Sequence, residues 1–153
     1  MRKSLMILVV MAPALLAQGG ANCRDVSGAI LTNFLDQTTT LGTATGDLKG
    51  GLGVSVLSLA PGANGTVVFH NHHHWVTETG DTIVLNDAYA TAYPSGIAGL
   101  YAVSYTNGAT IGGGTGRFAG ATGKIAFYGA VDLNKGQVIL RYEGQVCYLG
   151  VTP

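Results

Sequence analysis

The segment from Gly112 to Gly123 constrains the fold of this chain more than any other. It reads GGGTGRFAGATG, so six of its twelve residues are glycine. An ordered glycine costs conformational entropy, and such a density is expected where the backbone needs positive φ, a tight reversal or close approach to another chain segment. The segment therefore predicts a defined turn between two strands, with Phe118 anchoring that turn to the core.

A glycine-rich loop can also bind phosphates, but the context here does not fit that use. Phosphate-binding loops follow a strand and open a helix, with Lys-Ser/Thr or a ribose-binding acid at fixed spacing. The residues that follow here, Lys124 to Asp132, form a β-rich run without helical period. We therefore do not expect a nucleotide site.

The stretch GGGTGRFAGATGKIAF resembles the Gly-Gly-Ser/Thr-Gly-x-Phe-x-Gly-x-x-Gly segment of the allene oxide cyclase and dirigent barrel superfamily, which includes small secreted bacterial members. The likeness extends over about Thr66 to Cys147, with Gly80–Leu85 in the corresponding order. It implies a closed, calycin-like barrel, often trimeric, that binds a small molecule. The cyclases hold their substrate with a glutamate on the first strand and a tyrosine before the glycine segment. Neither is matched: Val26–Leu31 has no carboxylate, and Tyr105 falls one residue out of step, on the opposite face.

The first residues have the order of a secretory signal peptide. Arg2 and Lys3 precede an apolar run from Leu5 to Leu16, and small residues follow. We expect a signal peptide over residues 1–21, with cleavage after Ala17 or Ala21, and export to the periplasm or the medium. No later segment has the roughly 20 apolar residues of a membrane span.

Residues 22–153 have the size of one domain with its own core. Without Arg2 and Lys3 the chain has six basic and eight acidic residues, a formal charge of −2, and no basic run. We therefore expect no nucleic-acid partner, because phosphate binding requires clustered Lys and Arg. Nothing in the sequence indicates a cofactor.

The two cysteines, Cys23 and Cys147, lie near the two ends of this domain. An even pair in an exported chain indicates a disulfide. In a closed barrel the first and last strands are neighbours, so the bridge would join them. A reactive thiol is the alternative, but no CxxC spacing or flanking base supports it.

Helical periodicity is nearly absent after residue 21, and short β-rich runs alternate with turn signals. This pattern predicts an all-β fold, a closed antiparallel up-and-down β-barrel of about eight strands, with a sandwich as the alternative. Asp36–Gly51 is ambiguous between a loop and an extra strand. The expected strands are Val26–Asn33, Leu52–Leu59, Thr66–Thr77, Asp81–Ala90, Gly99–Tyr105, Lys124–Leu133 and Gln137–Tyr148.

All four histidines lie in the run Phe69–Val76. On a strand, His70, His72 and His74 share one face, and Phe69, Asn71, His73 and Trp75 share the other. The simplest interpretation is a polar outer row opposite a Phe69/Trp75 core row. Two alternatives remain. His70 with His72, or His72 with His74, could bind a metal ion with a further ligand such as Glu78, Asp81 or Asp87, although no metal is favoured. His72 could also be an acid or base in a pocket.

Tyrosines form a second group of candidates. Tyr101 and Tyr105 share one strand face, and a barrel could project several phenols into one cavity, where they would suit a small apolar or aromatic ligand. An inward carboxylate could then move protons. The ligand-binding candidates are Tyr101, Tyr105, Tyr142 and Trp75; the catalytic candidates are His72, Glu78, Tyr105 and Glu143.

Three functions remain open on the sequence. The first is an exported barrel that binds a small apolar or aromatic molecule and guides its cyclisation or isomerisation. The second is a metal-binding protein built on the histidine strand, and the third is a non-catalytic exported homo-oligomer, with a trimer expected by resemblance.

Overall fold

The computed structural model describes residues 22–150; the expected signal peptide lies outside them. Strands and three short 3-10 helices make up the described part, and the helices are η1 (Gly46–Leu48), η2 (Ala63–Gly65) and η3 (Gly116–Phe118). The strands are β1 (Asn22–Phe34), β2 (Thr39–Ala44), β3 (Gly50–Pro61), β4 (Val67–Thr77), β5 (Thr82–Leu85), β6 (Ala88–Pro94), β7 (Leu100–Ser104), β8 (Ala109–Gly114), β9 (Thr122–Asp132) and β10 (Gln137–Tyr148).

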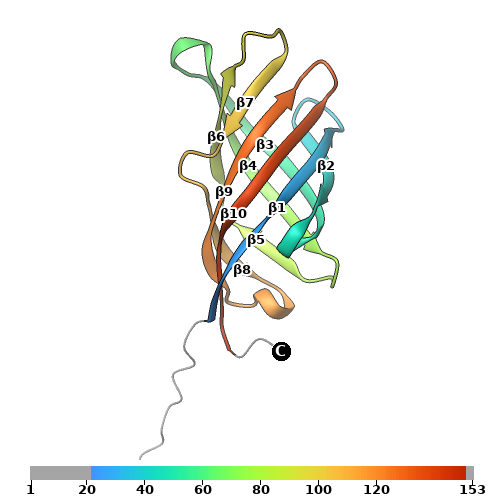
Figure 1. Ribbon diagram of the computed structural model, residues 1–153, viewed down its shortest axis with the longest axis vertical. Coiled ribbons are helices and arrows are strands. Elements are labelled where there is room, and N and C mark those ends of the chain that lie inside the picture. Colours follow the sequence, from blue (N-terminus) through green and yellow to red (C-terminus); the bar gives the residue numbers. More distant parts are fainter. Residues whose placement is uncertain (1–21, 151–153) are drawn as a thin grey trace, which may run out of the picture.

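The strands close into an antiparallel barrel of eight positions (Figure 1). Strands β1 to β4 pair in sequence order, and β10 closes the wall by pairing with both β9 and β1. Two positions are each shared by two short strands: β5 and β6 both pair with β4, and β7 and β8 both pair with β9. The predicted all-β closed barrel is confirmed.

Three segments differ from the expected strand bounds. Gly112–Gly114 belong to β8, and the reversal is confined to η3 and the residues after it. The ambiguous stretch Asp36–Gly51 contains strand β2 and helix η1. The strand expected over Asp81–Ala90 is divided at Asn86. The Asn86 N–H donates to the Thr110 carbonyl, and its side-chain amide donates to Thr110 Oγ1. After this point the chain pairs with the N-terminal part of β4, Val67–Asn71.

The end of the barrel near η1 and η3 is filled by large side chains. Trp75 donates from Nε1 to the Leu48 carbonyl (2.8 Å). The Tyr142 hydroxyl donates to the Thr45 carbonyl (2.7 Å) and accepts from the Leu48 N–H (2.9 Å). Phe118 is fully buried, as predicted for the anchor of the glycine segment. Because the polar tips of Trp75 and Tyr142 are paired, this end is a packed core.

The predicted disulfide is confirmed. Cys23 and Cys147 are bonded and lie directly opposite each other in the β1–β10 pairing. The bond therefore joins the first and last strands across the seam that closes the barrel. Among the described residues, no helix is long and apolar enough to cross a membrane.

Two glycines of the barrel wall provide a matched test of backbone constraint. Gly123 has φ +141°, and a Cβ there would collide with the Gln145 carbonyl oxygen, whereas a Cβ on Gly51 meets nothing within 4 Å. We expect Gly123→Ala to lower the free energy of unfolding by about 2 kcal/mol, because it combines a steric clash with an unfavourable φ. Gly51→Ala should change it by less than about 0.5 kcal/mol. Urea unfolding of the two variants measures the difference, and equal effects would contradict the backbone geometry at Gly123.

Candidate functional site

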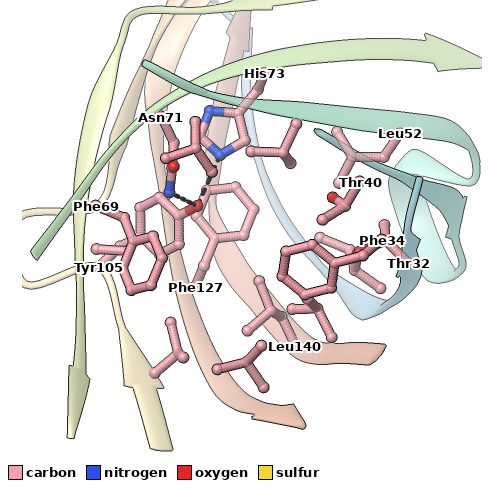
Figure 2. Close-up of a pocket in the computed structure, with 17 residues that line it drawn as sticks. Thr32, Phe34, Thr40, Leu52, Phe69, Asn71, His73, Tyr105, Phe127 and Leu140 are labelled. Atoms are coloured by element: carbon pink, nitrogen blue, oxygen red, sulfur yellow. Dashed lines mark hydrogen bonds between the residues drawn. The ribbon is translucent and has the colours of Figure 1, made fainter. Parts of the chain in front are cut away.

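The opposite half of the barrel contains a cavity of about 70 Å³ that is partly open to solvent. Figure 2 shows side chains from several strands converging on it. Most of the lining is aliphatic or aromatic, and its polar members are two threonines, Asn71, His73 and Tyr105. The lining residues are Ile30, Thr32, Phe34, Thr40, Leu52, Val54, Val56, Phe69, Asn71, His73, Ala90, Val103, Tyr105, Phe127, Val131, Val138 and Leu140.

Strand alternation in β4 brings two polar side chains into this apolar interior. Asn71 and His73 lie on the inner face together with Trp75, and all three are buried. His70, His72 and His74 lie on the outer face, where they are half-buried or exposed. The predicted separation of the two faces is thus confirmed, and His73 is the histidine that enters the barrel.

Tyr105 joins Asn71 and His73 in one hydrogen-bonded network (Figure 2). Asn71 Nδ2 donates to the Tyr105 hydroxyl oxygen (2.9 Å), and His73 Nε2 lies 3.0 Å from the same oxygen. Since the amide already donates to this oxygen, the phenol hydrogen is available for Nε2, which assigns the imidazole hydrogen to Nδ1. His73 also stacks on Phe127, with ring centres 5.7 Å apart and an interplanar angle of 9°.

Tyr105 follows the end of β7, and strand alternation from Val103 points its side chain inward. Its N–H donates to the Phe127 carbonyl (2.9 Å), and its own carbonyl accepts from the Gly108 N–H (2.8 Å). The side chain is 5% exposed and faces the cavity. This agrees with the strand alternation that places Tyr105 on the same face as Tyr101.

Burial keeps both titratable members of the network neutral. It lowers the pKa of His73 to about 4, an effect to which the neighbouring His72 adds, and it raises the pKa of Tyr105 to about 12. Because the pKa of the phenol lies far above that of the imidazole, the proton stays on Tyr105. At neutral pH the cavity wall therefore carries no charge from this network.

Two polar atoms of the network have no hydrogen-bond partner among the described residues: Asn71 Oδ1 and His73 Nδ1. Both are buried, and a buried polar atom without a partner costs about 1–3 kcal/mol. A native structure seldom retains such atoms without a structural or functional reason.

The other candidates from the sequence lie away from the cavity lining. Trp75 and Tyr142 belong to the packed end, and Tyr101 is half-buried against the core. Glu143 is exposed, and Glu78 forms an exposed ion pair with Lys49 (3.0 Å). His72 lies outside, where its Nδ1 is 2.6 Å from Asp87 Oδ1. Of the four catalytic candidates, only Tyr105 reaches the cavity.

The role of Asn71 and His73 in the cavity was not predicted from the sequence. The signal was present, because strand alternation places both on the same face as Phe69 and Trp75, and polar side chains on a core face require partners. Phe127 had no comparable signal. Within residues 22–150, no cluster of three or more His, Cys, Asp or Glu side chains could hold a metal ion.

These features define a closed eight-position β-barrel with one end packed and a partly open apolar cavity at the other. No family model and no curated protein matches the chain. A solved structure that it resembles is that of a pterocarpan synthase dirigent protein, with 17% sequence identity, 93% of this chain and 99% of that chain covered, and a TM-score of 0.36. At these values the likeness carries no argument about function, and the barrel rests on the strand pairings described above.

Proposed function

We propose that this protein is an exported barrel that binds one small apolar or aromatic molecule in its open half. The observation that carries the proposal is the partly open cavity, whose lining is mainly aliphatic and aromatic. Binding sites for small molecules are typically concave and apolar, with a few polar groups that fix orientation. The Asn71–Tyr105–His73 network supplies such groups on one wall.

Export is supported by two features of different kinds. The order of charged, apolar and small residues before Asn22 is that of a signal peptide. The Cys23–Cys147 disulfide is a bond that oxidising compartments preserve. Mass spectrometry of the protein from the native host would test this directly, because a mature chain should begin at or near Asn22 and carry a cysteine pair that resists alkylation.

The binding proposal predicts the effect of filling the cavity. Val103 lines the cavity, whereas Val84 is exposed on the outer wall. We expect Val103→Phe to weaken ligand binding at least tenfold, because the new ring occupies the space of the ligand, and Val84→Phe to leave binding unchanged. Native mass spectrometry and thermal shift with polyene, phenolic and fatty-acid ligands provide the measurement. If no ligand in such a panel binds the unmodified protein, the proposal fails.

We further propose that a reaction in the cavity, such as a cyclisation or isomerisation, is directed by the shape of the wall. The support is the neutral state of His73 and Tyr105, whose pKa values of about 4 and about 12 lie far from neutrality. Efficient general acids and bases have pKa values near the working pH. Product ratios formed from a bound substrate should therefore be constant between pH 6 and 9, and a bell-shaped dependence in that range would contradict shape control.

We further propose that the protein assembles as a homo-oligomer, a trimer by the resemblance of its sequence to the barrel superfamily, and the outer wall offers a suitable face. Leu31 and Ile139 lie opposite each other on β1 and β10, and both are about half exposed. Leu41 on the neighbouring β2 extends this apolar area. Light scattering after size exclusion measures the mass, and a monomer at micromolar concentration would reject this assembly.

A further inference from the structure

The outer face of β4 carries a row of histidines that the cavity does not use. His72 and His74 are adjacent in this row, with ring centres 4.6 Å apart and an interplanar angle of 73°. His72 is held at Nδ1 by Asp87 Oδ1 (2.6 Å), so its Nε2 lies on the far side of the ring from the carboxylate. His70 is engaged differently: its ring stacks on Tyr89 at 4.5 Å, and its Nε2 lies 3.9 Å from Asp87 Oδ2.

The electrostatic surroundings of the row favour a cation. The strands that pair with β4 are β3, β5 and β6, and none of them contains a Lys, Arg, Asp or Glu. Asp87 lies in the connection between β5 and β6, and its carboxylate is the charged group that faces the histidine row there. The side chain of His74 also has room to move, because its partner on β3 is Gly53.

The spacing of the two rings suits one shared metal ion. An imidazole nitrogen binds a divalent first-row ion at about 2.0–2.1 Å, which places the ring centre roughly 3.2 Å from the ion. If both rings bound one ion with their centres still 4.6 Å apart, these centres would subtend about 90° at the ion. Such an angle corresponds to adjacent positions in the square-planar or tetragonal geometry that Cu²⁺ and Ni²⁺ prefer. Because the rings lie edge to face in the unbound protein, at 73°, the His74 side chain has to turn to bring a nitrogen to the ion.

We propose that His72 and His74 form a surface site for a divalent transition-metal ion, with Cu²⁺ bound most tightly, and that Asp87 orients His72 for this role. A carboxylate that accepts the second ring hydrogen of a histidine ligand fixes its tautomer and raises its basicity. With two protein ligands, the remaining positions of the ion are open to water or to an external ligand. The site lies on the outer wall and is independent of ligand binding in the cavity.

The test is calorimetric titration of Cu²⁺ and Ni²⁺ into the full protein, purified without an affinity tag, at pH 7.4. We expect one ion per chain and an order of affinity Cu²⁺ above Ni²⁺. His72→Gln and His74→Gln should each weaken Cu²⁺ binding at least tenfold. Asp87→Asn should weaken it about tenfold or more, as removal of a carboxylate behind a metal-binding histidine does. Electron paramagnetic resonance of the Cu²⁺ complex should show two nitrogen ligands, and one in either histidine variant.

His70→Gln is the matched control, since His70 lies on the same face and also approaches Asp87. It should change the Cu²⁺ affinity less than twofold. An effect of His70→Gln as large as that of His74→Gln would overturn the assignment of ligands. The site itself is rejected if the His72→Gln/His74→Gln double variant binds Cu²⁺ as tightly as the unmodified protein. All these side chains are partly exposed, so thermal unfolding should confirm that every variant is folded.

Discussion

Removing the disulfide should lower the free energy of unfolding by about 4–5 kcal/mol, the largest effect that we expect from any change in this protein. Cys23 and Cys147 are separated by 124 residues, so the bond restricts nearly the whole unfolded chain. In the chain-entropy description, the stabilisation by a disulfide grows with the length of the loop that it closes. The double variant Cys23→Ser/Cys147→Ser, studied by urea unfolding, provides the measurement.

The same experiment tests whether the disulfide acts on the unfolded state or on the folded state. If the bond acts on the unfolded state, its removal should also raise the m-value, because an unlinked chain exposes more surface on unfolding. The native barrel should change little, since β1 and β10 pair over twelve register positions without the bond. A loss below about 1 kcal/mol with an unchanged m-value would show that the denatured chain is already constrained.

Acidification should destabilise the protein through His73. Its pKa in the folded state is about 4, below the value of about 6.5 for an unfolded histidine. Between these two pH values the unfolded chain binds a proton that the folded chain does not, so stability falls as the pH decreases from 6.5 to 4. The expected loss from this one residue is about 3 kcal/mol.

The contribution of His73 is isolated by comparison with His73→Phe. Urea unfolding at several pH values between 7 and 4.5, with a chelator present, should give a shallower decline for this variant than for the unmodified protein. The carboxylates contribute equally to the pH dependence of both proteins, so their contribution cancels when the two curves are subtracted. His74→Phe, one position along the strand but exposed, should retain the full decline. Parallel curves for the unmodified protein and His73→Phe would contradict the neutral, buried state of His73.

The barrel could be predicted from local features of the sequence. Turn residues and alternating β-rich runs predicted most strands, and the position of Cys23 and Cys147 near the chain ends indicated which strands are neighbours. The divided strands were not predicted, because β5 with β6, and β7 with β8, are separated by contacts to other strands. One such contact is the pairing of Asn86 with Thr110.

The candidate site was predicted only in part, and for a physical reason. Alternation correctly grouped Tyr105 with Tyr101, and His73 with Phe69 and Trp75, on common strand faces, yet it could not show which inward residues lie in the open half. The division of the interior into a packed half and an open half depends on η1. The Leu48 backbone of this helix hydrogen-bonds to Trp75 and Tyr142 and holds both side chains in the packed end. Two residues that suited a ligand by type are therefore part of the core.

One half of this barrel is packed with large side chains, and the other half contains the cavity proposed to bind a ligand. The disulfide and Phe118, the anchor of the glycine segment, belong to the end that contains Trp75 and Tyr142. Substitutions among Val54, Val103 and Val138 should alter which molecule the protein accepts without touching the Leu48 contacts to Trp75 and Tyr142, so this chain offers a scaffold for redesigning ligand selectivity.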